Sequence, residues 1–207
     1  MAASVKFSVA IGLVEIHHQQ MSYDLIVYAA KLDPNPIIVW MKRLDEYDRL
    51  KFEIHPGVEF ELGLSGFCPI KVTVPGRWPF SSAQSYISGF EMSVDDFDFE
   101  SHFDLKNGDV EAKREELSAE GLDLEHWEHF KSQIFISFRP NNRFEARLSF
   151  LSAAILTEEL GGLCVDPQTG VTLDQATVFS WATAQVRQND LDIQDKNLFS
   201  HPFDGWK

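Results

Sequence analysis

The spacing of the apolar residues changes near residue 109, and this change limits the fold more than any other feature of the chain. Upstream, apolar side chains occupy every second position, as in Ile70, Val72 and Val74. Downstream, they recur at intervals of three and four, as in Phe144 and Leu148. Alternation is typical of a strand with one buried face, whereas a period of about 3.6 is typical of an amphipathic helix. The chain therefore divides into a strand-rich first half and a helix-rich second half.

The alternating pattern predicts most of the strands. We expect strands over residues 5–13, 37–40, 52–54, 58–62, 70–74, 86–94 and, further along, 134–138. The two runs at 52–54 and 58–62 flank His55-Pro56-Gly57, which predicts a β-hairpin with one buried and one solvated face. Residues 22–32 are apolar and fit either a helix or a strand.

The helical pattern comes with end signals. We expect helices over residues 41–50, 109–120, 124–130, 142–160 and 174–186. Asn142 is placed to cap the longest of these, and Gly161-Gly162 to end it. Asp174 is placed to cap the last one.

This order of elements predicts an α+β fold. We expect an antiparallel sheet built mostly from the N-terminal half, packed by helices mostly from the C-terminal half. No linker-like segment divides the chain, so residues 1–207 form a single predicted domain. Residues 190–207 are polar but carry Leu198, Phe199, Phe203 and Trp206, and we interpret them as a docking tail that binds either to the same chain or to a partner.

The net charge limits the kinds of partner. Against 18 basic residues the chain has 32 acidic ones, a formal net charge of −14. A surface this acidic repels phosphate backbones, which argues against unaided binding of nucleic acid and favours a basic partner. Hydrophobic residues make up 44% of the chain, which excludes a disordered or low-complexity scaffold.

Three further features predict a cytoplasmic protein without a membrane association. No apolar run reaches the roughly 18 residues that a spanning helix needs. The N-terminal residues have neither the basic head nor the long apolar run of a signal peptide. Cys68 and Cys164 lie in apolar surroundings outside any CxxC motif, which favours buried free thiols in a reducing compartment.

Most of the negative charge lies between residues 91 and 128. This segment has 14 acidic residues and three basic ones, a net charge of −11. We predict that it binds a protein partner through an acidic ledge, which consists of Asp95, Asp96, Asp98, Glu100 and Asp104. If extended, residues 96–104 place carboxylates on one face and phenylalanines on the other. A solvated edge strand and a cation site of hard oxygen ligands are the alternative interpretations.

One short pattern resembles a metal-nuclease motif. Residues 109–113 spell D-x-E-x-K, but they open a polar, helix-like run, which favours an exposed helix face. Serine-nucleophile elbows, phosphate-binding loops and dinucleotide-binding loops are absent from the sequence. We therefore predict a protein that is not an enzyme and has no cofactor. The alternative is a metal-dependent hydrolase or nuclease that uses Asp98, Asp104, Glu111 and Lys113.

A second enzyme alternative uses two histidines. His126 and His129 are three residues apart, a spacing that places two zinc ligands side by side on a helix. No third Cys or His follows nearby, and the H-E-x-x-H motif is absent. A solvated helix face beside a packed Trp127 accounts for the same residues. The neighbouring pair His17-His18 has no nucleophile motif around it.

The run from residue 154 to residue 170, AILTEELGGLCVDPQTG, resembles a pattern in bacterial toxin-immunity proteins, including those of polymorphic-toxin and type VI secretion systems. In these proteins an amphipathic helix leads into Gly-Gly, a short strand and a turn of the Asp-Pro-Gln type. The resemblance implies a cognate inhibitor that binds and blocks a secreted toxin, and the net charge adds the expectation that this toxin or effector is basic. A phage or secretion-system adaptor remains the other non-enzymatic interpretation.

Overall fold

The computed structural model describes residues 22–32, 35–47, 50–75, 82–106, 108–192 and Trp206. The strands are β1 (Tyr23–Ala29), β2 (Lys51–Ile54), β3 (Ser65–Val74), β4 (Gln84–Asp96), β5 (Ser132–Phe138), β6 (Leu163–Asp166) and β7 (Val171–Leu173). The helices are α1 (Ile37–Tyr47), α2 (Phe99–His102), α3 (Val110–Ala119), α4 (Leu124–Glu128), α5 (Arg143–Glu159) and α6 (Val178–Asp192). The strand predicted over residues 5–13, His17-His18 and most of the predicted tail lie outside the described residues.

The described strands form one seven-stranded sheet in the order β2-β3-β4-β5-β1-β6-β7. Every neighbouring pair in this order is antiparallel. The longest register joins β3 to β4 from Ser65↔Ser93 to Val74↔Gln84. Residues 22–32 fit either element on sequence; of these, Tyr23–Ala29 form the interior strand β1, which pairs on one edge with β5 and on the other with β6.

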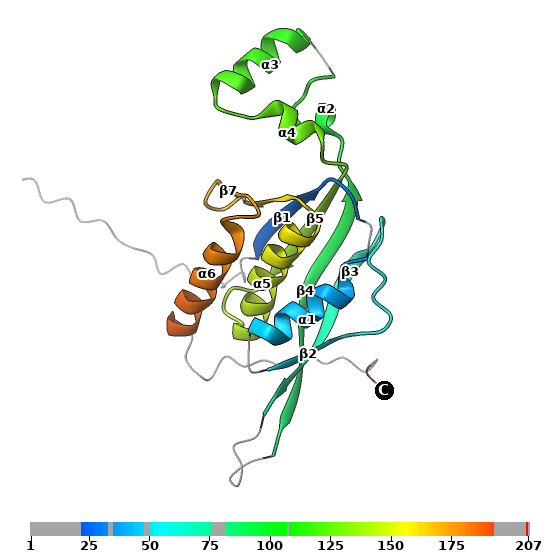
Figure 1. Ribbon diagram of the computed structural model, residues 1–207, viewed down its shortest axis with the longest axis vertical. Helices are drawn as coiled ribbons and strands as arrows, with labels where there is room; N and C mark the ends of the chain where they lie inside the picture. The colour runs from blue at the N-terminus through cyan, green and yellow to red at the C-terminus, as the bar shows by residue number, and fades with distance from the viewer. Residues whose placement is uncertain are drawn as a thin grey trace, which may run out of the picture.

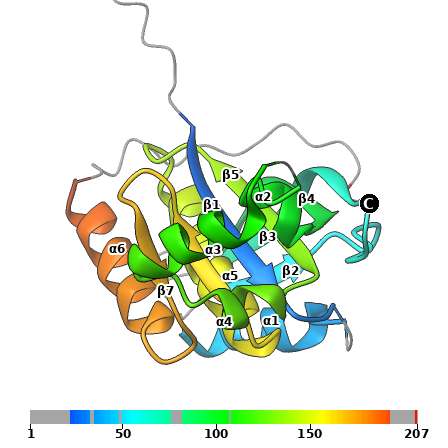
Figure 2. The same cartoon turned by 90° about the horizontal axis from the view of Figure 1, so that it is seen from above.

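Three helices cover one face of this sheet, with α5 between α1 and α6 (Figures 1 and 2). The core lies between α5 and the strands, and it includes Leu25, Ile134 and Leu151, all fully buried. The prediction of an α+β fold with an antiparallel sheet and mostly C-terminal helices is therefore confirmed. No helix in the described part of the chain combines the length and the apolar character needed to cross a membrane.

The ends of α5 follow the predicted signals. The side chain of Asn142 accepts hydrogen bonds from the backbone N–H groups of Phe144 and Glu145, so it caps the helix. Glu145 reaches back to accept from the Arg139 N–H at 3.0 Å, and also from the Asn142 amide at 2.8 Å. Gly161 has a φ of 65°, and a Cβ at Gly162 would lie 2.0 Å from the carbonyl oxygen of Tyr28. Glycine is therefore required at both positions.

The prediction of a strand over residues 37–40 was wrong, because these residues form the first turn of α1. The side chain of Asn35 accepts from the Ile37 N–H at 3.0 Å, and Pro36 follows the cap. A capping residue followed by proline starts a helix despite the β-branched residues that come after it. Trp40 then turns into the core and donates from its indole nitrogen to the Ser152 hydroxyl at 2.9 Å.

The prediction of a hairpin over residues 52–62 was also wrong. Lys51–Ile54 does form a strand, but its partner is β3, with Phe52 opposite Val72. Residues 58–62 belong to a connection, in which Phe60 is buried against Trp40 at 6.5 Å between ring centroids. The alternation therefore marks buried side chains correctly, but a buried side chain does not require a strand partner.

The two cysteines are buried and free, as expected from the sequence. Cys68 lies on β3 and Cys164 on β6, and both side chains face the helices. Burial raises the pKa of each thiol to about 12. Both sulfurs are therefore protonated and unreactive near neutral pH.

Candidate functional site

An acidic insertion joins β4 to β5 and stands beyond the end of the sheet (Figure 1). We call residues 97–131 the apical module; it contains α2, α3 and α4. It has 11 acidic residues and four basic ones, a net charge of −7. This small part of the chain thus has half of the net charge of −14.

An aromatic cluster attaches the apical module to the sheet. Its buried members are Tyr28, Phe97, Trp127, Phe130 and Leu163. Tyr28 on β1 lies at the centre, with ring centroids 4.9 Å from Phe97 and 4.7 Å from Trp127. Burial raises the pKa of Tyr28 to about 12. The module therefore has its own apolar base, separate from the core under α5.

Backbone hydrogen bonds close the same junction. The N–H of Phe97 donates to the carbonyl of Lys131, and the N–H of Lys131 donates to the carbonyl of Ala29, both at 2.9 Å. The first and last residues of the module are thus bound to each other and to β1. An insertion held at its base in this way keeps a fixed position relative to the sheet.

The extended conformation considered for residues 96–104 is wrong. β4 ends at Asp96, and residues 99–102 form the short helix α2. The Asp98 side chain caps this helix by accepting from the Ser101 N–H at 3.2 Å. Asp98 also pairs with Lys106, and this contact together with the Ser101 hydrogen bonds lowers its pKa to about 2. The cap redirects the chain, so the phenylalanines pack inward instead of lining one strand face.

The five residues of the acidic ledge are all exposed at the junction of β4 and the module. Asp95 and Asp96 end β4, Glu100 lies in the first turn of α2, and Asp104 follows α2 with a φ of 53°. Asp98 has a structural role as a cap and ion-pair partner. Asp95 accepts a hydrogen bond from the Ser93 hydroxyl at 2.9 Å. All five predicted acids are thus exposed near this junction, Asp98 as a structural carboxylate and the other four as surface ones.

Two further acids of the module also cap helices. Asp109 accepts from the Ala112 N–H and begins α3, and Asp123 accepts from the His126 N–H and begins α4, both at 3.1 Å. The D-x-E-x-K run therefore lies at a helix start, which confirms the helix-face interpretation. Asp109 is bound to the backbone rather than facing Glu111 across a metal site.

One arginine holds α3 to the rest of the module. Arg114 pairs with Glu128 on α4, and its guanidinium lies 5.6 Å from the centre of the Phe99 ring. On α3, the side chain of Leu117 is buried. The remaining face of α3 presents acids such as Glu111 and Glu115 to solvent, and Glu120, which follows α3, is exposed as well.

The two histidines proposed as zinc ligands line a shallow hollow between the module and the body. His126 and His129 share it with Asp123, Glu125 and Gly161. The Nδ1 atom of His129 contacts the Glu125 carbonyl oxygen at 2.5 Å. Within the described residues, no group of three or more His, Cys, Asp or Glu side chains is arranged to hold a metal ion. In the alternative metal set of Asp98, Asp104, Glu111 and Lys113, Asp98 pairs with Lys106, and Lys113 pairs with Glu116 at 2.9 Å.

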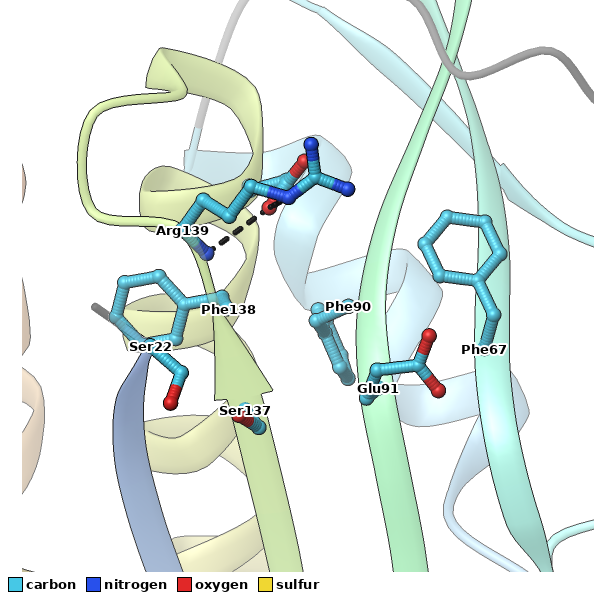
Figure 3. Close-up of a pocket in the computed structure, with 8 residues that line it drawn as sticks. Ser22, Phe67, Phe90, Glu91, Ser137, Phe138 and Arg139 are labelled. Atoms are coloured by element: carbon cyan, nitrogen blue, oxygen red, sulfur yellow. Dashed lines mark hydrogen bonds and ion pairs between the residues drawn. The ribbon is translucent and has the colours of Figure 1, made fainter. Parts of the chain in front are cut away.

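A second hollow lies at the opposite end of β5, with a volume of about 310 Å³ (Figure 3). Phe67, Glu91, Ser137 and Arg139 line it, and Figure 3 shows the Arg139 backbone bound to the carboxylate of Glu145. That carboxylate is 3% exposed and belongs to the capping arrangement of α5. This carboxylate already stabilises the start of α5 through its two hydrogen bonds. The hollow is therefore a weaker candidate for a binding site than the apical module.

The structure therefore defines an α+β protein with a helix-covered antiparallel sheet and an acidic apical insertion. Comparison of the chain with family models, with curated proteins and with solved structures gave no match.

Proposed function

We propose that this chain is a non-enzymatic binding protein whose apical module docks a basic protein partner. We further propose that the partner is a bacterial toxin or effector domain, which the chain neutralises in the cytoplasm as an immunity protein. One observation carries the proposal: a module with a net charge of −7 stands beyond the sheet, and the acidic ledge at its junction with β4 is exposed to solvent.

The charge of the module favours fast capture of a basic partner. Clustered surface charge of one sign steers an oppositely charged protein toward it and raises the association rate. Several of the acids, such as Glu111, Glu115 and Glu120, make no ion pair with another residue in the described part of the chain. Repulsion between these acids destabilises the module when no partner is bound, and a cationic partner surface would relieve this repulsion.

The attachment of the module supports specificity as well as speed. Its aromatic base and its backbone hydrogen bonds hold the acids in one arrangement before the partner arrives. A prearranged surface loses less conformational entropy on binding than a mobile one. If the toxin is a nuclease, the carboxylates would occupy the basic groove that otherwise binds nucleic-acid phosphates.

The structure determines which acids to change in a test. Asp98 caps α2, and Asp104 has a φ of 53°, so lysine at either position would disturb the backbone. Asp96 and Glu100 are exposed, and neither of them caps a helix or has a positive φ. We therefore choose Asp96→Lys/Glu100→Lys as the apical variant. Glu46→Lys/Glu59→Lys makes the same change of charge elsewhere on the surface and is the control.

The experiment uses the wild-type chain, the apical variant and the control variant as tagged baits in a lysate of the native host. We expect one basic protein to be retained by the wild type and the control in about equal amount to the bait, and to be lost from the apical variant. We also expect this protein to arrest growth when expressed alone and to be harmless with the wild-type chain. Equal retention by all three baits would refute the role of the ledge.

Other outcomes decide between the remaining interpretations. Retention of a structural phage or secretion protein that is not toxic would favour an adaptor. A bait that retains no partner but purifies with a stoichiometric metal ion would favour the hydrolase or nuclease alternative. Either result would contradict the proposed immunity function.

A further inference from the structure

A row of three side chains crosses the sheet at the second hollow, on the face that α1, α5 and α6 do not cover. In the strand registers, Glu91 lies opposite Phe67 of β3 on one side and opposite Ser137 of β5 on the other. Phe90 and Phe138, which adjoin this row along the chain, belong to the core under the helices. Because successive side chains of a strand alternate between faces, the row projects from the opposite face.

The hollow forms because β5 ends here while β4 continues. β5 pairs with β4 as far as Glu91↔Ser137, whereas β3 stays paired with β4 to Val74↔Gln84. Figure 3 shows the side chain of Arg139 extending from the end of β5 toward β4. The volume of about 310 Å³ lies at the lower end of the range for ligand pockets, roughly 300–1,000 Å³, so the hollow suits one small molecule.

Two opposite charges border the hollow without neutralising each other. Among the described residues, the exposed carboxylate of Glu91 has no ion pair and no hydrogen bond. Within the same part of the chain, the Arg139 guanidinium approaches an acid only through Nε, which lies 4.0 Å from Glu145. The Glu145 carboxylate is already bound by the Arg139 backbone N–H and the Asn142 amide. The two terminal nitrogens of the guanidinium are therefore left for a ligand.

These groups match the two charges of a free amino acid. A guanidinium binds a carboxylate through two parallel hydrogen bonds, and a carboxylate accepts hydrogen bonds from an ammonium. The hydroxyls of Ser22 and Ser137 can donate or accept, and the rings of Phe67, Phe90 and Phe138 provide apolar contact. A ligand with a single charge would leave either the guanidinium or the carboxylate unpaired. A zwitterion with an apolar side chain uses both charges and the rings.

We propose that the second hollow is a binding site for a free α-amino acid with an apolar side chain. The ligand carboxylate binds the guanidinium of Arg139, and the ligand ammonium binds the carboxylate of Glu91. This inference does not depend on the proposed function, because the hollow and the apical module lie at opposite ends of β5 and share no residue.

An NMR titration of the full chain tests the site, with L-phenylalanine and L-leucine as probes. We expect saturable shifts of the amide resonances of residues 89–91 and 137–139, and unchanged resonances over residues 97–131. L-phenylalaninamide lacks the carboxylate, and N-acetyl-L-phenylalanine lacks the ammonium. Each should bind at least roughly tenfold more weakly than L-phenylalanine, because each loses one charge-assisted contact.

Two variants assign the charges to their residues. Arg139→Gln retains the backbone N–H that binds Glu145, and it should bind L-phenylalanine and L-phenylalaninamide with similar, low affinity. Glu91→Gln should likewise bind L-phenylalanine and N-acetyl-L-phenylalanine with similar, low affinity. Arg187→Gln and Glu59→Gln change exposed residues elsewhere on the surface, and as controls they should bind like the wild type.

The absence of saturable shifts with both amino acids would overturn the proposal. If the wild type bound L-phenylalaninamide or N-acetyl-L-phenylalanine as tightly as L-phenylalanine, the hollow would instead take a peptide terminus. This comparison of ligands depends on no variant. Wild-type affinity in both Arg139→Gln and Glu91→Gln would place the ligand elsewhere and would contradict the assignment.

Discussion

The indole ring of Trp127 lies edge-on against the phenol ring of Tyr28, with 4.7 Å between their centroids. Tyr28 belongs to the interior strand β1, and Trp127 belongs to α4 of the apical module. This contact therefore joins the apical module, which we propose binds the partner, to the sheet, which provides the stability of the molecule. Both side chains are more than nine-tenths buried, so their packing is sensitive to truncation.

Replacement of Trp127 by alanine should release the apical module while leaving the sheet folded. Truncation of a buried tryptophan costs about 3–5 kcal/mol, and here the loss falls on the module because α3 adds few buried side chains. Hydrogen exchange should show lost protection over residues 97–131 and retained protection in α5. Val110→Ala, at a side chain that is 41% exposed in the same module, should leave both regions unchanged. Loss of protection throughout the chain would show that the module is not a separate unit.

His102 should make the module sensitive to mild acid. It stacks on Trp127 with 5.9 Å between ring centroids, and partial desolvation there lowers its pKa below the usual value of 6.5. Because the folded state then binds the proton less readily than the unfolded state, stability is fully present above about pH 6.5 and declines as pH falls below it. The titration of the His102 ring by NMR should therefore have a midpoint below 6.5. A midpoint at or above that value would contradict the packing described here.

The cap of α5 should carry a measurable part of the stability. Asn142 is 2% exposed and holds two backbone N–H groups as well as Glu145. Asn142→Ala should lower the free energy of unfolding by about 1–2 kcal/mol in urea. The exposed neighbour Asn141 is the matched control, and its replacement by alanine should change this free energy little. Equal effects of the two substitutions would refute the capping role.

A tyrosine hydroxyl closes the turn that follows β6. The Tyr23 hydroxyl donates to the buried carboxylate of Asp166 at 2.6 Å, and burial together with this carboxylate raises the Tyr23 pKa. Tyr23→Phe should lower the free energy of unfolding by roughly 1.5–3 kcal/mol, the loss expected for a hydrogen bond to a charged acceptor. The contribution is present below the usual tyrosine pKa of about 10 and is lost as pH rises above it. Thermal unfolding of both variants and the wild type measures this loss. The Tyr86 hydroxyl bonds to exposed Gln84, so Tyr86→Phe should lower the free energy of unfolding much less.

The parts of the fold that the sequence predicts are those in which local pattern and packing agree. The stripe from Phe144 to Ile155, with Asn142 before it and Gly161 after it, predicts α5 nearly residue by residue. At residues 37–40 the β-branched pattern disagrees with the Asn35-Pro36 start signal, and the start signal prevails. Strand pairing is not encoded locally, which is why Phe52 finds its partner in β3 rather than across the nearest turn.

The sequence predicts the acidic composition of the candidate site but not its three-dimensional structure. Counting charges finds the acidic segment, and alternation suggests a strand through it. The spacing of Asp98 and Ser101 is a capping signal that overrides this alternation. The contact of Trp127 with Tyr28 joins residues from distant parts of the chain, so no local pattern predicts that the module has its own aromatic base.

The most direct test of the central claim is the association rate of the captured partner with the chain, measured by stopped flow at low and high salt. We predict that Asp96→Lys/Glu100→Lys lowers the rate constant at low salt by roughly tenfold or more and weakens its salt dependence. Glu46→Lys/Glu59→Lys should retain most of the wild-type rate, and all three chains should unfold at nearly the same temperature. Identical rates for the apical and control variants would contradict docking through the apical module.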